Sequence, residues 1–109
     1  MNWNILTTEE QLAAILAASH AKPQVIFKHS TRCSISDVVK TRLEKSETPQ
    51  SIDFHYLDLI ALRSLSNKIS MDLNVYHESP QILLIKNGDC IFDESHMAIR
   101  MQDILAEAV

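Results

Sequence analysis

Short apolar runs alternate with amphipathic stretches along this chain, and no other feature constrains its fold as much. Strand-like patterns cover residues 3–6, 24–28, 52–59, 81–86 and 89–92, and helix-like patterns cover residues 8–19, 33–45, 60–73 and 98–108. Strands separated by helices form right-handed crossovers and pair in parallel, whereas strands joined by a tight turn are antiparallel. The predicted order, β-α-β-α-β-α-β-β-α, therefore indicates an α/β fold with a mixed central sheet and helices on both faces.

Local signals set the expected boundaries. Thr7 followed by Glu10 has the spacing of a helix capping box, and Pro23 ends the helix that starts there. Asn87-Gly88 between two apolar runs is typical of a two-residue hairpin turn. Pro80 suits the first residue of a strand, where no ladder hydrogen bond is required of it.

The size and charge of the chain limit the classes of function that it can have. The 109 residues match one domain, so we predict a single domain over residues 1–109. The net charge is −4 and the ten Lys and Arg are scattered, which disfavours binding to nucleic acid or an anionic membrane. Without an apolar leader or a run of 18 apolar residues, we expect a soluble, cytoplasmic monomer.

Two cysteines, Cys33 and Cys90, lie too far apart in sequence to suggest a disulfide framework or a zinc knuckle. None of the five histidines forms a ligand pair on a helix, so we expect no metal site and no tightly bound cofactor. Cys90 is placed about opposite Ile85 and interpreted as a packed strand residue. His96, between the last strand and helix, is interpreted as a surface or capping residue.

Cys33 follows a predicted buried strand and adjoins the first turn of a helix. The thiolate is the form that attacks disulfides, and the positive end of a helix stabilises that charge. Arg32 and His29 are placed to add one permanent and one titratable positive charge. Polar neighbours favour a reactive cysteine over a buried structural one. We predict Cys33 to be the catalytic nucleophile, with a thiolate environment of Arg32, His29, Ser34 and Ser36.

The residues around this cysteine also carry a family resemblance. The segment Phe27-Lys28-His29-Ser30-Thr31-Arg32-Cys33-Ser34-Ile35-Ser36, with Ser79-Pro80-Gln81 downstream, resembles the monothiol bacilliredoxins of the thioredoxin superfamily. The order of elements is likewise that of thioredoxin. In the family the cysteine precedes proline, isoleucine and serine, and this chain has Ser34 where proline is usual. The resemblance covers nearly the whole chain and implies a thioredoxin-like fold.

The resemblance implies a thiol–disulfide oxidoreductase. Cys33 would take a low-molecular-weight thiol, bacillithiol by analogy, from S-thiolated proteins, and these two would be its partners. Pro80 would be cis and lie beside Cys33, leaving the backbone of Ser79 to bind substrate. Ser36 stands where thioredoxins have a second cysteine, so resolution falls to an external thiol or to Cys90. The residues themselves do not distinguish bacillithiol from glutathione or coenzyme A.

Two alternatives stay open. One is an iron–sulfur carrier like the monothiol glutaredoxins, which share a cluster between two copies, although those have Cys-Gly-Phe-Ser where this chain has Cys33-Ser34-Ile35-Ser36. The other is a thioredoxin-fold adaptor in which the cysteine is incidental. A phosphatase-like or arsenate reductase loop is excluded, because it needs an arginine six residues after the cysteine and this chain has Val39 there.

Overall fold

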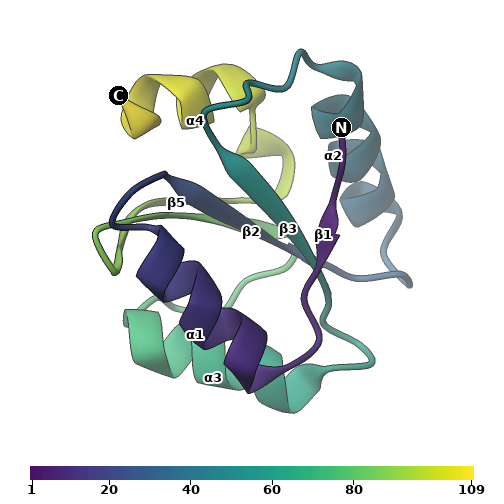
Figure 1. The fold of residues 1–109 in the computed structure, drawn as a ribbon. Coiled ribbons are helices and arrows are strands. Elements are labelled where there is room, and N and C mark those ends of the chain that lie inside the picture. The colour runs from purple at the N-terminus through teal and green to yellow at the C-terminus, as the bar shows by residue number, and fades with distance from the viewer.

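The computed structural model describes residues 1–109 and contains every predicted element in the predicted order (Figure 1). The elements are β1 (Asn4–Ile5), α1 (Glu9–Ala18), β2 (Gln24–His29), α2 (Ser34–Lys45), β3 (Asp53–Asp58), α3 (Arg63–Leu73), β4 (Gln81–Lys86), β5 (Asp89–Ser95), the 3₁₀ helix η1 (His96–Ala98) and α4 (Met101–Ala108). No helix has the length and apolar character needed to span a membrane.

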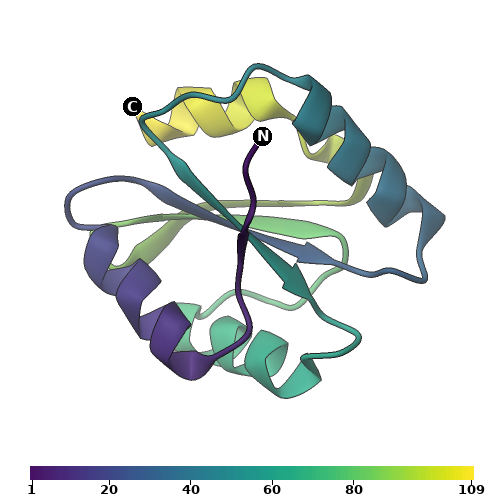
Figure 2. The ribbon, with the colours of Figure 1, turned by 45° about the vertical axis from the view of Figure 1, so that its right-hand side comes forward.

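The five strands form one mixed sheet in the order β1-β3-β2-β4-β5. The central strand β2 pairs in parallel with β3 and antiparallel with β4, and β5 is antiparallel to β4. Helices α2 and α4 cover one face of the sheet, and α1 and α3 cover the other (Figure 2). This arrangement confirms the predicted thioredoxin-like fold.

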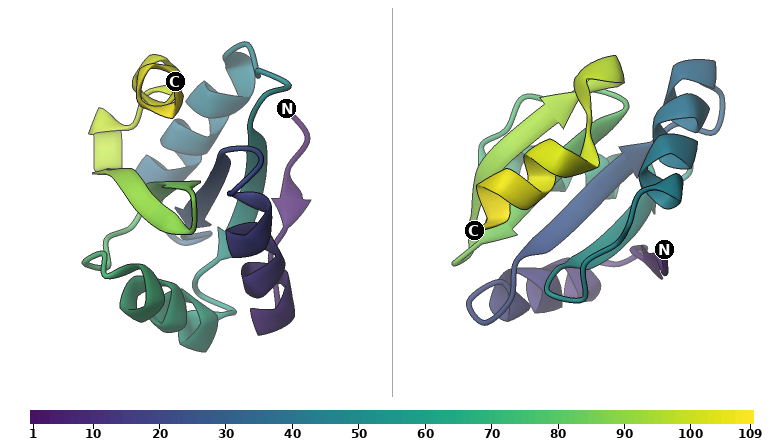
Figure 3. Two further views of the ribbon diagram at one scale, coloured as in Figure 1. Left: turned by 60° about the vertical axis from the view of Figure 1, so that its left-hand side comes forward. Right: turned by 90° about the horizontal axis from the view of Figure 1, so that it is seen from above.

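Side-chain alternation along β2 divides the core into two layers. Val25 and Phe27 pack toward α2 and α4, whereas Ile26 packs toward α1 and α3. All six residues of β2 are buried, which confirms the prediction of a buried central strand. Seen from above the sheet, α2 and α4 lie across the same face (Figure 3). The strand that leads to Cys33 is therefore enclosed on both sides.

The capping box of α1 lies one residue later than the predicted Thr7–Glu10 pair. The hydroxyl of Thr8 accepts a hydrogen bond from the N–H of Gln11 at 3.1 Å, and Oε1 of Gln11 accepts one from the N–H of Thr8 at 3.0 Å. Thr8 has the extended backbone of an N-cap residue. Neighbouring threonines made two registers possible, and the amide side chain of Gln11 decides between them.

Helix α3 begins at Arg63 and not at Ile60 as predicted. The carboxylate of Asp58 explains the delay, because its Oδ1 accepts hydrogen bonds from the N–H groups of Ile60 and Ala61 at 3.1 and 3.3 Å. An aspartate that bonds the backbone just after itself stabilises a turn in competition with a helix. The apolar spacing of this segment did not reveal that competition.

The C-terminal boundaries also differ from the prediction. Strand β5 continues to Ser95 because it pairs with β4 as far as Gln81. Helix α4 starts at Met101 and not at Ala98, because the completely buried Ile99 is held in an extended conformation between η1 and α4.

The β4–β5 hairpin turns at Asn87-Gly88 as predicted, and Cys90 pairs with Ile85. Asn87 and Gly88 have positive φ values of 56° and 81°, as the tight hairpin turn with two left-handed residues requires. The turn is fastened to the end of α1, since Ser19 accepts hydrogen bonds from both residues, through its carbonyl at 3.0 Å and its hydroxyl at 2.8 Å.

Replacing Gly88 by alanine is expected to lower the free energy of unfolding by about 1 kcal/mol, because an L side chain is strained at positive φ. The added methyl group would meet His20 only at ordinary contact distance, 3.5 Å, so backbone strain alone sets the cost. Urea denaturation measures the change. The matched variant Asn87→Gly should stay within about 0.5 kcal/mol of wild type, since both residues tolerate positive φ. Equal stabilities for Gly88→Ala and wild type would contradict this account.

Candidate functional site

Cys33 is the N-cap residue of α2 and has an extended backbone, with φ −115° and ψ 119°. Its N–H donates to the carbonyl of Ser30 and its carbonyl accepts from the N–H of Asp37, each at 3.2 Å. The side chain is partly exposed and makes no capping hydrogen bond. N-cap side chains normally accept hydrogen bonds from the free N–H groups of the first turn. A thiolate at this position is therefore next to unpaired donors and the positive end of the helix.

Ser36 fixes the turn that carries Cys33. Its fully buried hydroxyl accepts a hydrogen bond from the N–H of Ser30 at 3.1 Å and lies 2.6 Å from Nδ1 of His29. On its other side the ring presents Nε2 to the carboxylate of Asp37, which can only accept, so we assign the ring proton to Nε2 and leave Nδ1 to accept from the Ser36 hydroxyl. Nε2 in turn lies 3.4 Å from Oδ1 of Asp37. These contacts join the end of β2 to the first turn of α2.

His29 acts here through hydrogen bonds and packing instead of charge. Its ring is buried against Phe27 and Tyr56, with centroid distances of 5.6 and 5.4 Å. Burial lowers the pKa of His29, while the nearby Asp37 carboxylate opposes that shift. The ring is therefore neutral at pH 7, so it does not supply the titratable positive charge that the sequence suggested. Sequence spacing alone did not show that this side chain turns into the core.

Arg32 and Ser34, the other two residues of the predicted thiolate environment, are exposed on either side of Cys33. Arg32 carries a permanent positive charge and directly precedes Cys33 in the chain. Ser34 is the first residue of α2, where a proline would have no N–H to offer. The serine at this position therefore adds one backbone donor to the helix end that faces Cys33.

Ser79 and Pro80 lie at the same end of the sheet as Cys33. Gln81 pairs with Lys28, so Pro80 falls opposite the end of β2 from which the Cys33 turn emerges. The Ser79–Pro80 peptide bond is cis, as the family resemblance implies. Ser79 makes no hydrogen bond to another main-chain group, and its hydroxyl oxygen is buried without a partner.

His96 borders this segment in a way that its position in the sequence did not reveal. The residue has a φ of +57°, rare for a residue with a side chain, and its N–H donates to the carbonyl of Pro80 at 2.9 Å. Its side chain is 54% exposed, as expected of a surface residue, and Nε2 lies 3.6 Å from Oε2 of Glu78. No local sequence signal marks a left-handed histidine.

Cys90 lies at the other end of the sheet. It pairs with Ile85, which pairs with Gln24 at the start of β2, whereas Cys33 follows the end of β2. A six-residue strand spans roughly 16 Å, far beyond the 7 Å or so that a disulfide allows between Cα atoms. Burial also raises the pKa of the Cys90 thiol to about 11. Cys90 is thus a packed strand residue, and the geometry gives it no access to Cys33.

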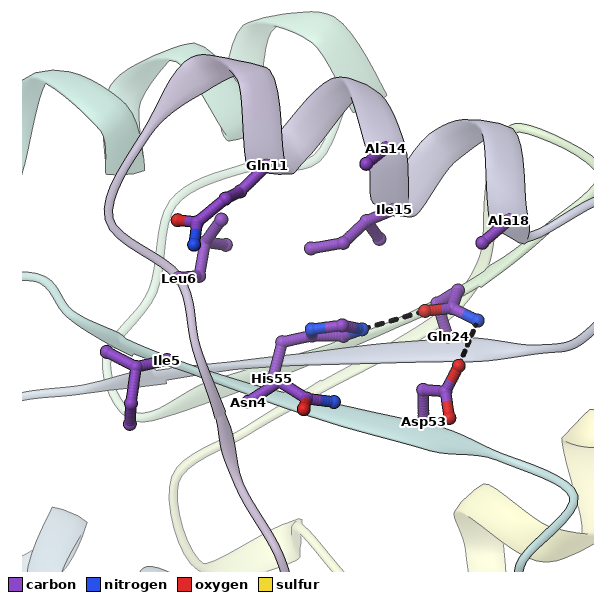
Figure 4. Close-up of a pocket in the computed structure, with 10 residues that line it drawn as sticks. All are labelled: Asn4, Ile5, Leu6, Gln11, Ala14, Ile15, Ala18, Gln24, Asp53 and His55. Atoms are coloured by element: carbon purple, nitrogen blue, oxygen red, sulfur yellow. Dashed lines mark hydrogen bonds between the residues drawn. The ribbon is translucent and has the colours of Figure 1, made fainter.

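A cavity of about 290 Å³ opens between α1 and the β1–β3 edge (Figure 4). His55, Gln24 and Asp53 form a hydrogen-bonded row along its polar side, with distances of 2.7 and 3.0 Å, while residues of α1 form its apolar side. Gln24 and Asp53 begin their strands, so the cavity lies far from Cys33. No cluster of three His, Cys, Asp or Glu residues is arranged to hold a metal ion.

Comparison with solved structures identifies the class of protein. A protein described as a candidate oxidoreductase with a thioredoxin fold is 30% identical, with 95% of this chain and 90% of that chain covered and a TM-score of 0.80. Thioredoxin from Malassezia sympodialis is 17% identical over 99% and 92% of the two chains, with a TM-score of 0.80. Thioredoxin from Fasciola hepatica is 16% identical over 95% and 98%, with a TM-score of 0.77. Fold and site together define a thiol oxidoreductase of the thioredoxin type.

Within that class the chain belongs to the monothiol bacilliredoxin family. Residues 4–104 match the sequence model of the family described as monothiol bacilliredoxin BrxC. The match extends over both Cys33 and the Ser79–Pro80 segment. This result confirms the resemblance that the residues around Cys33 carry.

Acidification is expected to destabilise the protein below about pH 6.5, the ordinary pKa of histidine. The lowered pKa of His29 means that the unfolded chain binds a proton at a pH where the native ring does not, so the free energy of unfolding falls as pH decreases through this region. His29→Asn should flatten the dependence partly, because the half-buried His55 and His77 also have lowered pKa values and contribute as well. Denaturation from pH 5 to 8 tests this, and identical slopes would rule out the buried neutral ring.

Proposed function

We propose that this protein is a monothiol thiol–disulfide oxidoreductase that removes bacillithiol, or a similar low-molecular-weight thiol, from mixed disulfides with proteins. The observation that carries the proposal is the partly exposed Cys33 thiol at the start of α2, with the buried hydroxyl of Ser36 where a resolving thiol would stand. The proposed setting is the cytoplasm, where small thiols keep protein cysteines reduced. The proposed acting form is the monomer, because one chain contains both Cys33 and the Ser79–Pro80 segment.

The reaction proceeds by two thiol–disulfide exchanges. The Cys33 thiolate attacks the sulfur of the small thiol in the mixed disulfide, a new S–S bond forms, and the protein thiolate leaves and takes up a proton from water. A second molecule of the small thiol, as its thiolate, then attacks the adduct on Cys33. This step releases the symmetric small-molecule disulfide and regenerates the Cys33 thiolate. The second small thiol is the reductant, so Cys90 is not required.

Two groups of the site are suited to the two halves of such a substrate. The free backbone of Ser79 can pair with an extended segment of the thiolated protein, as a strand added to a sheet edge does. Exposed Arg32 favours a small thiol that carries carboxylates, because its guanidinium binds a carboxylate through two parallel hydrogen bonds. No further cofactor takes part in the proposed cycle.

The decisive experiment follows the intact mass of the reduced protein with bacillithiol disulfide or glutathione disulfide near neutral pH. We expect rapid addition of one bacillithiol to wild type and to Cys90→Ser, and no addition to Cys33→Ser, because only Cys33 lies at a helix end. Membership of the bacilliredoxin family leads us to expect faster addition with bacillithiol disulfide than with glutathione disulfide. A rate no higher than that of a free model thiol with both disulfides would refute the reductase and leave the adaptor role.

Introducing a second thiol by Ser36→Cys is expected to change how the adduct is resolved. Positions 33 and 36 are the N-cap and the third residue of α2, the two positions whose residues interact in a helix capping box. The variant should release the small thiol and accumulate an internal disulfide that lacks two hydrogens. Its stability should fall by about 1 to 3 kcal/mol, because Ser30 and His29 lose the hydroxyl.

The matched control is Ser34→Cys, which adds a thiol on the exposed side of the same turn. Adjacent cysteines do not readily form a disulfide without strain, so this variant should keep the small thiol on Cys33. Mass spectrometry after addition of one equivalent of the small disulfide distinguishes the two variants. A persistent adduct in Ser36→Cys would show that the two side chains do not meet.

A further inference from the structure

Lys28 is a buried cation that the proposed chemistry does not use. Its side chain has 0% exposure, although lysine is among the residues least often buried. It lies on β2 next to His29 but faces α3, on the opposite side of the sheet from α2. No carboxylate pairs with it, and burial alone lowers the pKa of Lys28 to about 8. The group therefore still carries its charge at pH 7.

Three acceptors surround the ammonium group. Nζ donates to the carbonyl of Ser66 at 3.0 Å, to the hydroxyl of Ser70 at 2.8 Å and to Nδ1 of His77 at 3.3 Å. An ammonium group has three hydrogens, so these contacts satisfy it completely. Ser66 and Ser70 belong to α3, whereas His77 belongs to the irregular segment between α3 and β4. Lys28 thus links three parts of the chain at one point.

His77, the third partner of Lys28, connects this cluster to the candidate substrate-binding segment. His77 precedes Ser79 by two residues, so the cluster holds the segment that ends in the cis peptide beside the Cys33 turn. Burial lowers the pKa of His77, as do the charges of Lys28 and Arg63, while Glu78 opposes them. The ring is therefore neutral at pH 7 and Nδ1 can accept.

Besides Lys28, one other side chain of the sheet, that of Gln81, forms hydrogen bonds with the segment before Pro80. The buried amide of Gln81 donates to the carbonyl of Tyr76 at 2.9 Å and accepts from the N–H of Glu78 at 3.4 Å.

Helix α3 adds a bond from the N–H of Val75 to the carbonyl of Ser70 at 3.0 Å and a longer contact of the Ser66 hydroxyl with Nδ1 of His77 at 3.5 Å. Because the segment has no regular secondary structure, the loss of the shorter Lys28 bond should be felt locally.

Stability does not explain why a charge occupies this place. Removing an ammonium group from water without a counter-ion is unfavourable, and an apolar side chain of similar length would fill the same volume without that cost. Proteins keep some groups that lower stability because activity requires them. The contacts of Lys28 identify which geometry is held.

We propose that Lys28 is a positioning residue, whose ammonium group holds His77 and thereby sets the Ser79 backbone at the distance from Cys33 that disulfide transfer needs. This inference rests on the proposed function. Under this proposal, Lys28, on the face of β2 that packs against α3, positions the substrate-binding segment. His29, on the face that packs against α2, positions the thiol.

The test compares Lys28→Met with wild type at pH 7. We expect a Tm within a few degrees of wild type, because relief from burying a charge offsets the three acceptors that lose their donor. Amide exchange at Glu78, whose N–H donates to Gln81, should be faster by about tenfold or more, with unaltered exchange in β2 and β4. Alkylation of Cys33 by iodoacetamide should keep its rate, because the start of α2 is untouched. Transfer from an S-bacillithiolated peptide should slow by about tenfold, chiefly through a higher KM.

Three variants serve as controls. Lys68→Met removes a partly exposed lysine from α3 and should match wild type in every measurement. His77→Leu should reproduce the effect of Lys28→Met, whereas His77→Asn keeps an acceptor near Nδ1 and should restore slow exchange.

Several results would overturn the proposal. Unchanged exchange in Lys28→Met would show that Lys28 does not hold the segment. A lowered Tm with faster exchange everywhere would make Lys28 a purely structural residue. Fast local exchange with unaltered peptide transfer would remove its positioning role. If wild type takes no bacillithiol from the peptide, the proposed function fails, and the positioning role fails with it. The amide exchange data would still decide whether Lys28 fastens the segment.

Discussion

The complete enclosure of β2 is the constraint on which the rest of the structure depends. The strand is paired on both edges and covered on both faces, so none of its six residues is exposed. Successive side chains of a strand point to opposite faces, and Lys28 and His29 therefore act in different layers. His29 fixes the turn before α2 through Ser36, and Lys28 reaches α3 and the segment before β4. One short strand thus aligns the two parts of the site.

Ser36 shows how the monothiol character is built into the fold. Where thioredoxins have a second thiol, this chain has a fully buried hydroxyl that hydrogen-bonds to both the Ser30 N–H and the ring of His29. A thiol donates and accepts hydrogen bonds more weakly than a hydroxyl and would serve these partners poorly. The same oxygen that stands where thioredoxins have a second thiol also stabilises the turn, so the monothiol character is a structural property of the protein.

Local patterns predicted the order of elements, the Asn87-Gly88 hairpin and the place of Cys33, since each depends on residues close in sequence. Contacts between elements were beyond such reasoning. The turn of His29 into the core depends on how α2 packs over β2, and the left-handed backbone of His96 depends on its bond to Pro80. The burial of Lys28 contradicts the ordinary preference of lysine for water, so no composition or spacing rule would have indicated it.

The hydrogen bonds between Ser19 and the β4–β5 turn have a consequence for the order in which the chain folds. The Gly88–Ser19 hydrogen bond joins residues 69 positions apart, and β2 receives its β4 partner only when this C-terminal hairpin docks. Contacts of such long sequence separation form late in folding. During synthesis the Cys33 turn therefore emerges from the ribosome well before the strand that completes its surroundings. The turn that carries Cys33 therefore reaches its final surroundings only after the C-terminal hairpin has docked on β2.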